Sequence, residues 1–178
     1  SGYTLAGADA GNYSLTQPTG LTANITAVGL TITGLTGANK TYDRTTSASA
    51  TGTAALSGVL TADNGNVTLT GSGTFSFATA TIGNAKTISC TGYSLSGTAS
   101  GNYSLTQPSL SGNITAAALT VSGISGSNKT YDGTTTASVS GTAALSGVLS
   151  GDAVSLSGTP AFSFASASVG TAKSITAS

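Results

Sequence analysis

Asn39-Lys40-Thr41-Tyr42-Asp43 returns letter for letter as Asn128-Lys129-Thr130-Tyr131-Asp132, and this pentapeptide decides how the chain is interpreted. Its two tyrosines, at 42 and 131, are 89 residues apart. The stretch 11–18 likewise returns as 101–108, with an offset of 90. Because the offsets differ only where turn-like segments gain or lose a residue, we predict tandem repeats of one framework with variable loops.

The phase of the repeat divides the chain into three parts. Each Asn-Ile-Thr-Ala, at 24–27 and 113–116, precedes a β-branched Leu-Thr run that we interpret as the start of a unit. We expect 1–28 to be the C-terminal part of one repeat, 29–117 a complete repeat, and 118–178 the N-terminal part of the next. The incomplete ends together make one unit. They are expected to come from a longer array, or to complement each other between neighbouring molecules.

The composition limits the kinds of protein this can be. Of 178 residues, 38% are hydrophobic, 6% aromatic and 6% charged, and the formal net charge is +0. The balance of charge argues against nucleic acid and against electrostatically steered partners. No apolar run reaches the roughly 18 residues of a membrane-spanning helix, so no membrane span is predicted. The core of such a unit is thin, and we expect neighbouring units to support it.

Alternation with a period of two dominates the chain and predicts strands with one buried face. Thr74-Phe75-Ser76-Phe77 alternates strictly, so both phenyl rings should enter the core together. We also predict strands at Tyr3-Thr4-Leu5 and Tyr13-Ser14-Leu15, and a hairpin at the Asn-Gly of 63–66. Seven or eight short strands per unit, with no helix of ten or more residues, predict an all-β fold of tandem immunoglobulin-like β-sandwich repeats.

An ordered set of motifs runs along the chain: Lys129 to Thr135, Leu145 to Asp152, Val169-Gly170 with Lys173, and Gly2 to Leu5 through Asp9 to Tyr13. Together these motifs resemble one family, the YDG domain. The resemblance implies a bacterial immunoglobulin-like module of large secreted adhesins, including filamentous-haemagglutinin-like proteins. It therefore implies an extracellular location, at the bacterial cell surface or in a secreted biofilm matrix.

One position departs from the pattern of that family. Arg44 stands where the other copy keeps Gly133, the glycine of Tyr-Asp-Gly. If that glycine needs a positive φ, Arg44 is expected to be strained or its turn altered.

The residue types exclude most catalytic chemistry. The sequence has no histidine and no glutamate, so Ser-His-Asp, Cys-His and histidine-based metal sites are ruled out. The aspartates are scattered, and no Asp-x-Asp-x-Asp-Gly calcium loop occurs. We therefore expect no catalytic residues, no metal site and no cofactor, and do not predict an enzyme.

An intramolecular isopeptide bond is one covalent reaction that the residue types allow. A lysine of the pentapeptide would join an asparagine, and an aspartate would act as the acid. The alternative is that lysine and aspartate only make surface contacts around a turn. The candidate residues are Lys40, Lys129, Asp43, Asp132, Asn102 and Asn113, with Asn12 and Asn24 as further partners.

Two other modifications stay open. Seven asparagines begin an Asn-x-Ser/Thr sequon, so glycans are potential partners. The sequons begin at Asn12, Asn24, Asn39, Asn66, Asn102, Asn113 and Asn128. The single cysteine, Cys90, is expected to be a small buried hydrophobe, and a reactive or cross-linking thiol is the alternative.

The sequence thus predicts a non-catalytic structural repeat module whose partners are copies of itself or adjacent repeats in a fibre. The units would stack end to end, in one variant by strand complementation between the incomplete ends. The alternative is a carbohydrate- or surface-binding module, including ice binding through a threonine array such as Thr31-Ile32-Thr33.

Overall fold

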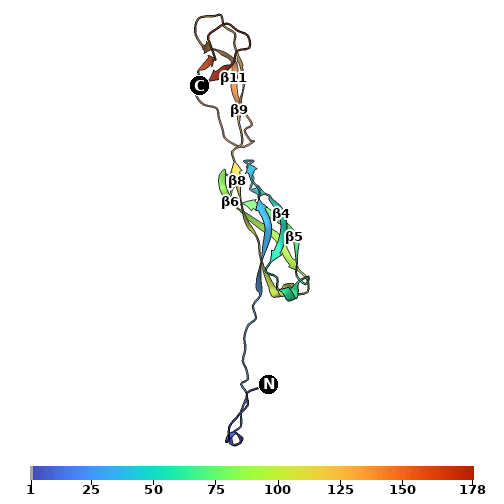
Figure 1. The fold of residues 1–178 in the computed structure, drawn as a ribbon. Helices are drawn as coiled ribbons and strands as arrows, with labels where there is room; N and C mark the ends of the chain where they lie inside the picture. The colour runs from blue at the N-terminus through green and yellow to red at the C-terminus, as the bar shows by residue number, and fades with distance from the viewer. Residues whose placement is uncertain (1) are drawn as a thin grey trace.

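In the computed structural model, which describes residues 2–178, the chain is an elongated rod (Figure 1). We name three parts of it. The N-terminal segment, 2–27, is an extended stretch of chain at one end of the rod. The middle unit, 28–115, is the best-packed part. The C-terminal unit, 118–178, follows beyond β8 at the other end. The predicted division at 28/29 and 117/118 stays a prediction, and Ser1 lies outside the described residues.

Eight strands form two sheets in the middle unit. The smaller sheet has the order β4-β1-β7, in which β1 pairs antiparallel with β4 and parallel with β7. The larger has the order β2-β8-β6-β5-β3, in which β2 pairs parallel with β8. The strands are β1 (Val28–Gly37), β2 (Lys40–Thr41), β3 (Ser47–Ala48), β4 (Ala50–Ser57), β5 (Thr68–Phe77), β6 (Gly83–Ser96), β7 (Tyr103–Thr106) and β8 (Ser109–Thr115).

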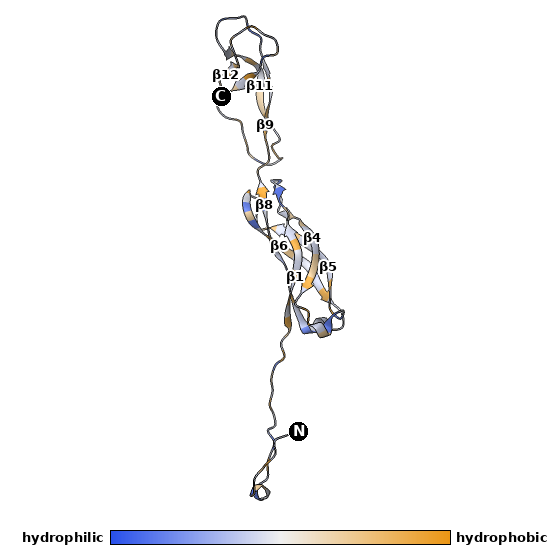
Figure 2. Ribbon diagram, viewed as in Figure 1, coloured by the Kyte–Doolittle hydropathy of each residue, from blue (hydrophilic) through white to orange (hydrophobic). Residues whose placement is uncertain are grey.

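Two apolar clusters make the core of the middle unit. The first contains Leu30, Val67 and Tyr103, with side chains such as Leu95 of β6 packed against them. Because Leu30 and Leu95 belong to different sheets, this cluster joins the two sheets. Figure 2 shows hydrophobic stretches on the strands of the middle unit.

The second cluster confirms the predicted placement of the phenyl rings. It contains Phe77, Ile88 and Ile114, and Phe75 packs against it. Phe77 is only 2% exposed, so both rings of the alternating stretch point into the same core.

The C-terminal unit has the same first strand pairing as the middle unit. Its sheets are β11-β9 and β10-β12-β13, built from β9 (Thr120–Gly126), β10 (Thr136–Ala137), β11 (Val139–Ser146), β12 (Phe162–Phe164) and β13 (Ile175–Ala177). Thr120 pairs with Ser146 as Thr31 pairs with Ser57. Yet the fully buried apolar side chains of residues 2–178 all belong to the middle unit.

A glycine pair shapes the first strand pair of both units, β1 with β4 and β9 with β11. Gly34 and Gly52 have φ of 83° and 99°, and a Cβ on Gly52 would lie 2.1 Å from the carbonyl oxygen of Gly34. Gly123 and Gly141 repeat this contact in the C-terminal unit. The pairing register shifts at these positions, so the glycines form a bulge that a side chain would obstruct.

The predicted strands of the N-terminal segment are absent. Neither Tyr3–Leu5 nor Tyr13–Leu15 is in a strand, and between them lies only the 3-10 turn η1 (Ala10–Asn12). In the middle unit the matching stretches pair with β5 and β1, and the N-terminal segment has no such neighbours. Among the contacts of residues 2–27, the Gln17 side chain bridges the two arms, since its Nε2 donates to the Tyr3 carbonyl oxygen at 2.6 Å.

The hairpin predicted at the Asn-Gly of 63–66 is also wrong. Asn64-Gly65 follows the 3-10 turn η2 (Thr61–Asp63) and connects β4 to β5. These two strands belong to different sheets, so the turn crosses between sheets. The Asn-Gly pair that favours a hairpin turn is present, but packing determines which strands β4 and β5 pair with.

The all-β class is confirmed. The helical segments of residues 2–178 are η1, η2 and η3 (Ser100–Asn102), each one turn of 3-10 helix. None of them is long or apolar enough to span a bilayer.

Candidate functional site

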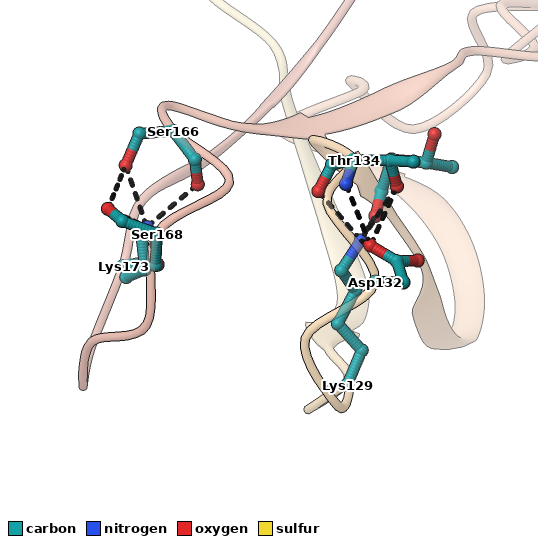
Figure 3. Close-up of polar contacts among 7 residues, drawn as sticks. Lys129, Asp132, Thr134, Ser166, Ser168 and Lys173 are labelled. Carbon is teal, nitrogen blue, oxygen red and sulfur yellow. Dashed lines mark hydrogen bonds and ion pairs between the residues drawn. The ribbon is translucent and has the colours of Figure 1, made fainter.

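The two lysines of the pentapeptide each hold a loop together. Lys40 Nζ lies 2.6 Å from Asp43 Oδ1 and donates to the carbonyl oxygens of Thr45 and Ser47 at 3.1 and 3.0 Å. Lys129 repeats the arrangement with Asp132 at 2.7 Å and with the carbonyl oxygens of Thr134 and Thr136 (Figure 3).

These contacts change the acidity of both aspartates. The hydrogen bond from Lys40, followed by that from the Thr45 backbone N–H, lowers the pKa of Asp43 to about 2. The same contacts from Lys129 and Thr134 lower the pKa of Asp132 to about 2. Both carboxylates are therefore charged and fixed at neutral pH, as acceptors within a turn.

The other two lysines of the sequence do the same work without a carboxylate. Lys86 Nζ donates to Thr79 Oγ1 and to the Thr81 carbonyl oxygen, both at 2.7 Å. Lys173 Nζ donates to the Ser166 carbonyl oxygen at 2.7 Å and to the Ser168 carbonyl oxygen (Figure 3). All four lysines are thus used to order hydroxyl-rich loops.

Asn113 lies near Lys40 in the larger sheet, since Ile114 pairs with Lys40 and the Asn113 backbone N–H donates to Asn39 Oδ1 at 2.7 Å. Among the polar contacts of residues 2–178, however, the candidate asparagine side chains do not bond these lysines. Asn113 Oδ1 accepts the Ala85 backbone N–H at 2.8 Å, and Asn102 ends η3, beside the loop of Asn66. The lysines meet Asp43 and Asp132 instead. The predicted bond itself stays a prediction that a mass measurement would test.

Cys90 lies in the interior. Its side chain is 5% exposed, and burial raises the pKa of its thiol. The thiolate, which is the reactive form, is therefore disfavoured.

A polar joint connects the middle unit to the C-terminal unit. The Tyr42 hydroxyl donates to Asp152 Oδ1 at 3.2 Å, and Arg44 Nε lies 3.0 Å from the same oxygen. The Arg44 guanidinium also donates to the Ser150 carbonyl oxygen. Burial first, and then the hydrogen bond to Asp152, raise the pKa of Tyr42, so its hydroxyl stays a donor.

Apolar side chains surround this joint. A shallow hollow of about 190 Å³ lies between the units. Its lining includes Ile82, Ala116, Leu119, Leu149 and Val154, together with Tyr42 and Asp152. The joint thus combines a small apolar contact with a hydrogen-bonded carboxylate.

Arg44 holds an unusual backbone conformation at this joint. Its φ is 68°, close to the 75° of Gly133. A non-glycine residue in this left-handed region costs roughly 1 kcal/mol. The strain expected from the Arg44 and Gly133 difference is therefore present, and the arginine side chain makes an ion pair there that glycine cannot.

The signal for the joint in the sequence is indirect. Arg44 differs from its counterpart Gly133, but no sequence pattern points to its partner Asp152, which is 108 positions away. The difference between the otherwise matching stretches around Arg44 and Gly133 is thus the sequence signal for the joint.

The C-terminal unit has an open groove of about 590 Å³. It is lined by Lys129, Tyr131, Phe164, Val169, Lys173 and Ile175, among others. In the middle unit, the counterparts of Phe164 and Ile175 are Phe77 and Ile88, and they pack on Ile114 of β8. The groove therefore occupies the place that β8 fills in the middle unit.

The comparison with known families decides the identity of both units. Two stretches, 26–110 and 115–178, match the family described as YDG domain. The chain belongs to the YDG domain family. No curated protein and no solved structure matches the chain. In this YDG chain the tyrosine of one motif, Tyr42, is the residue that meets the following unit.

The aspartate of the YDG motif has a separate role. Asp43 accepts the backbone N–H and the hydroxyl of Thr45, both at 2.9 Å, besides its lysine partner. The motif thus divides into a loop-forming Lys-Asp pair and a tyrosine, Tyr42, that packs against the second cluster and bonds the following unit.

Proposed function

We propose that this chain is a non-catalytic structural module of an extracellular bacterial adhesin or matrix filament. Immunoglobulin-like units with a period of about 89 residues would stack end to end. The observation that carries the proposal is the joint of Tyr42 and Arg44 with Asp152, because it bonds consecutive units along a rod. Units that each contact only their neighbours are typical of extended arrays.

The incomplete ends support stacking by strand complementation. Tyr13 is 73% exposed, whereas its counterpart Tyr103 is 7% exposed in the middle unit. Ile25 is fully exposed, whereas its counterpart Ile114 is 2% exposed. Residues 2–27 therefore carry apolar side chains of the kind that the groove of the C-terminal unit lacks. A neighbouring copy of this segment would add them as strands.

A glycine in the groove fits the same proposal. In the middle unit, a Cβ on Gly37 would lie 2.3 Å from the Ser111 carbonyl oxygen of β8. The counterpart Gly126 faces the open groove, where a Cβ would meet only the flexible Ile175 side chain, at 2.7 Å. A glycine is thus kept where an added strand needs close approach.

The proposed donor strand fits less closely than β8 does. A Cβ on Gly112 of β8 would lie 2.6 Å from the Ala38 carbonyl oxygen, and the donor segment has Ala23 at that position. Ala23→Gly is therefore expected to tighten association of the chain severalfold, as sedimentation velocity would show. A weakening by this substitution would contradict the proposed register.

The proposal is tested with the 178-residue chain by electron microscopy and sedimentation equilibrium. We expect end-to-end oligomers or filaments, and their loss in Ile25→Asp, which places a charge in the apolar groove. Thr26→Asp is the matched control, since its counterpart Thr115 is exposed in the middle unit. A chain that stays monomeric, or two variants that behave alike, would overturn strand complementation.

A carbohydrate- or surface-binding role is the second candidate. The observation in its favour is that Thr31 and Thr33 of β1 are both exposed, on one face of the strand. Against it, Tyr103 is buried rather than displayed. Replacing both threonines by valine should abolish glycan or ice binding if this role holds, and should leave association between copies unchanged.

A further inference from the structure

The joint leaves two matching surfaces without a partner inside residues 2–178. Leu149 lines the joint and is half-buried, whereas its counterpart Leu60 in the middle unit is 53% exposed. Asp63, the counterpart of Asp152, lies beside Leu60 in η2. At the far end, Tyr131 of the C-terminal unit is 65% exposed, and Tyr42 is its counterpart.

We propose that the surface around Asp63 and Leu60 binds the Tyr131 loop of a second copy, whose hydroxyl donates to the Asp63 carboxylate. This inference rests on the end-to-end stacking proposed above and names the residues that join one copy to the next. The apolar part of the contact is Leu60 with Val169 of the second copy, because their counterparts Leu149 and Ile82 line the same hollow.

The Asp63 carboxylate has room for a second donor. Within the middle unit it accepts the Tyr103 hydroxyl through Oδ2 at 2.7 Å. A carboxylate offers two oxygens and about four lone-pair positions. At the observed joint, Tyr42 and Arg44 both bond the Oδ1 of Asp152. In the proposed contact, the Asp63 carboxylate accepts two tyrosine hydroxyls. One is that of Tyr103 in its own unit, and the other is that of Tyr131 in the preceding unit.

The two kinds of joint differ in charge. The joint within the chain has the Arg44 guanidinium beside the aspartate, whereas the loop of Tyr131 has Gly133 at that position. The joint between copies therefore depends on a hydrogen bond and an apolar contact, and it should respond little to salt. An ion pair between partly exposed groups is screened by salt, so the joint within the chain should respond more.

The first experiment compares two tyrosine variants of the full chain by sedimentation equilibrium. Tyr131→Phe removes the hydroxyl proposed to reach Asp63, and we expect the association constant between copies to fall about tenfold. Tyr42→Phe is the matched control, because its hydroxyl already bonds Asp152 inside the chain; it should leave association unchanged. Equal association constants for both variants and the parent chain overturn the inference.

A second variant tests the inference by a gain of association. Gly133→Arg introduces the arginine that position 44 already has, at nearly the same φ. We expect tighter association that weakens as salt is raised. Adding Asp63→Asn to this variant should remove both the gain and the salt dependence. Gly133→Ala controls for backbone strain without a guanidinium, and an equal gain in it overturns the inference.

The results separate this inference from the proposal beneath it. A parent chain that does not associate at any concentration overturns both end-to-end stacking of copies and the contact at Asp63. Association that is lost in Ile25→Asp, but is indifferent to Tyr131→Phe and Gly133→Arg, overturns only the contact at Asp63. Thermal unfolding of each variant shows that the loss does not come from a misfolded middle unit.

Discussion

The middle and C-terminal units begin alike and end differently. β1 with β4, and β9 with β11, pair in the same register, including the glycine bulge. However, Phe77 and Ile88 are closed over by Ile114, whereas their counterparts Phe164 and Ile175 line an open groove. The first strand pair is therefore alike in both units, whereas the core is closed only in the middle unit, where β8 covers it.

A substitution at Ile114 should cost the most stability, because it opens the core of the middle unit, as the core of the C-terminal unit is open. Ile114→Ala removes a buried side chain from the second cluster, and we expect a loss of about 3 kcal/mol in the free energy of unfolding. Ile25→Ala, at the exposed counterpart, should change the unfolding of the dilute chain little. Urea denaturation measures both, and equal losses would contradict the difference in packing.

The second prediction concerns Gly37 and its counterpart Gly126, at the place where β8 approaches closely in the middle unit. Gly37→Ala places a Cβ 2.3 Å from the Ser111 carbonyl oxygen, so β8 must shift, at a cost of about 2 kcal/mol. Gly126→Ala meets only the Ile175 side chain and should cost less in the dilute chain. If Gly126→Ala is the more damaging variant, the groove is not the empty place of a strand.

Arg44→Gly should separate the effect of backbone strain at position 44 from the effect of the ion pair with Asp152. Relief of the positive φ should stabilise the middle unit by about 1 kcal/mol, whereas loss of the ion pair should loosen the joint. Asp152→Asn is the control that weakens the joint without relieving φ. Calorimetry reports the stability, and distances between spin labels on the two units report the joint. A stiffer joint in Arg44→Gly would contradict the role given to Arg44.

The smallest effect is a dependence on pH that the two units should share. The pKa of Asp43 and of Asp132 lies at about 2 in the folded chain, below the ordinary value of 3.8. Because the folded pKa is lowered, this stabilisation is full above about pH 5 and is lost as the pH falls through 4 toward 2. Lys40→Met and Lys129→Met should each remove part of that dependence in acid denaturation followed by circular dichroism. An unchanged acid profile would show that these loops do not contribute.

At high pH the joint between the two units should also respond. The pKa of Tyr42 is raised above 10.0, so its contribution is present below pH 10 and is lost as the pH rises through the folded pKa. Measured by the same spin-label distances, Tyr42→Phe should abolish this loosening.

Much of the local structure could be predicted because it depends on neighbouring residues. The alternation at 74–77 correctly placed Phe75 and Phe77 in one core, and the comparison with Gly133 anticipated the positive φ of Arg44. Predictions that needed a partner strand failed. Tyr3–Leu5 has strand composition but no neighbour, and Asn64-Gly65 has hairpin composition but flanking strands in different sheets.

The all-β class, the matching stretches around the two YDG motifs and the family could all be inferred from the amino-acid sequence. These follow from side-chain alternation, turn residues and shared motifs, which are local properties. The three-dimensional structure was needed to show that Lys40 and Lys129 hold their own loops, and that Tyr42 bonds Asp152, 110 residues away. Contacts over such separations are selected by which apolar faces can be buried together, and no local pattern specifies that choice.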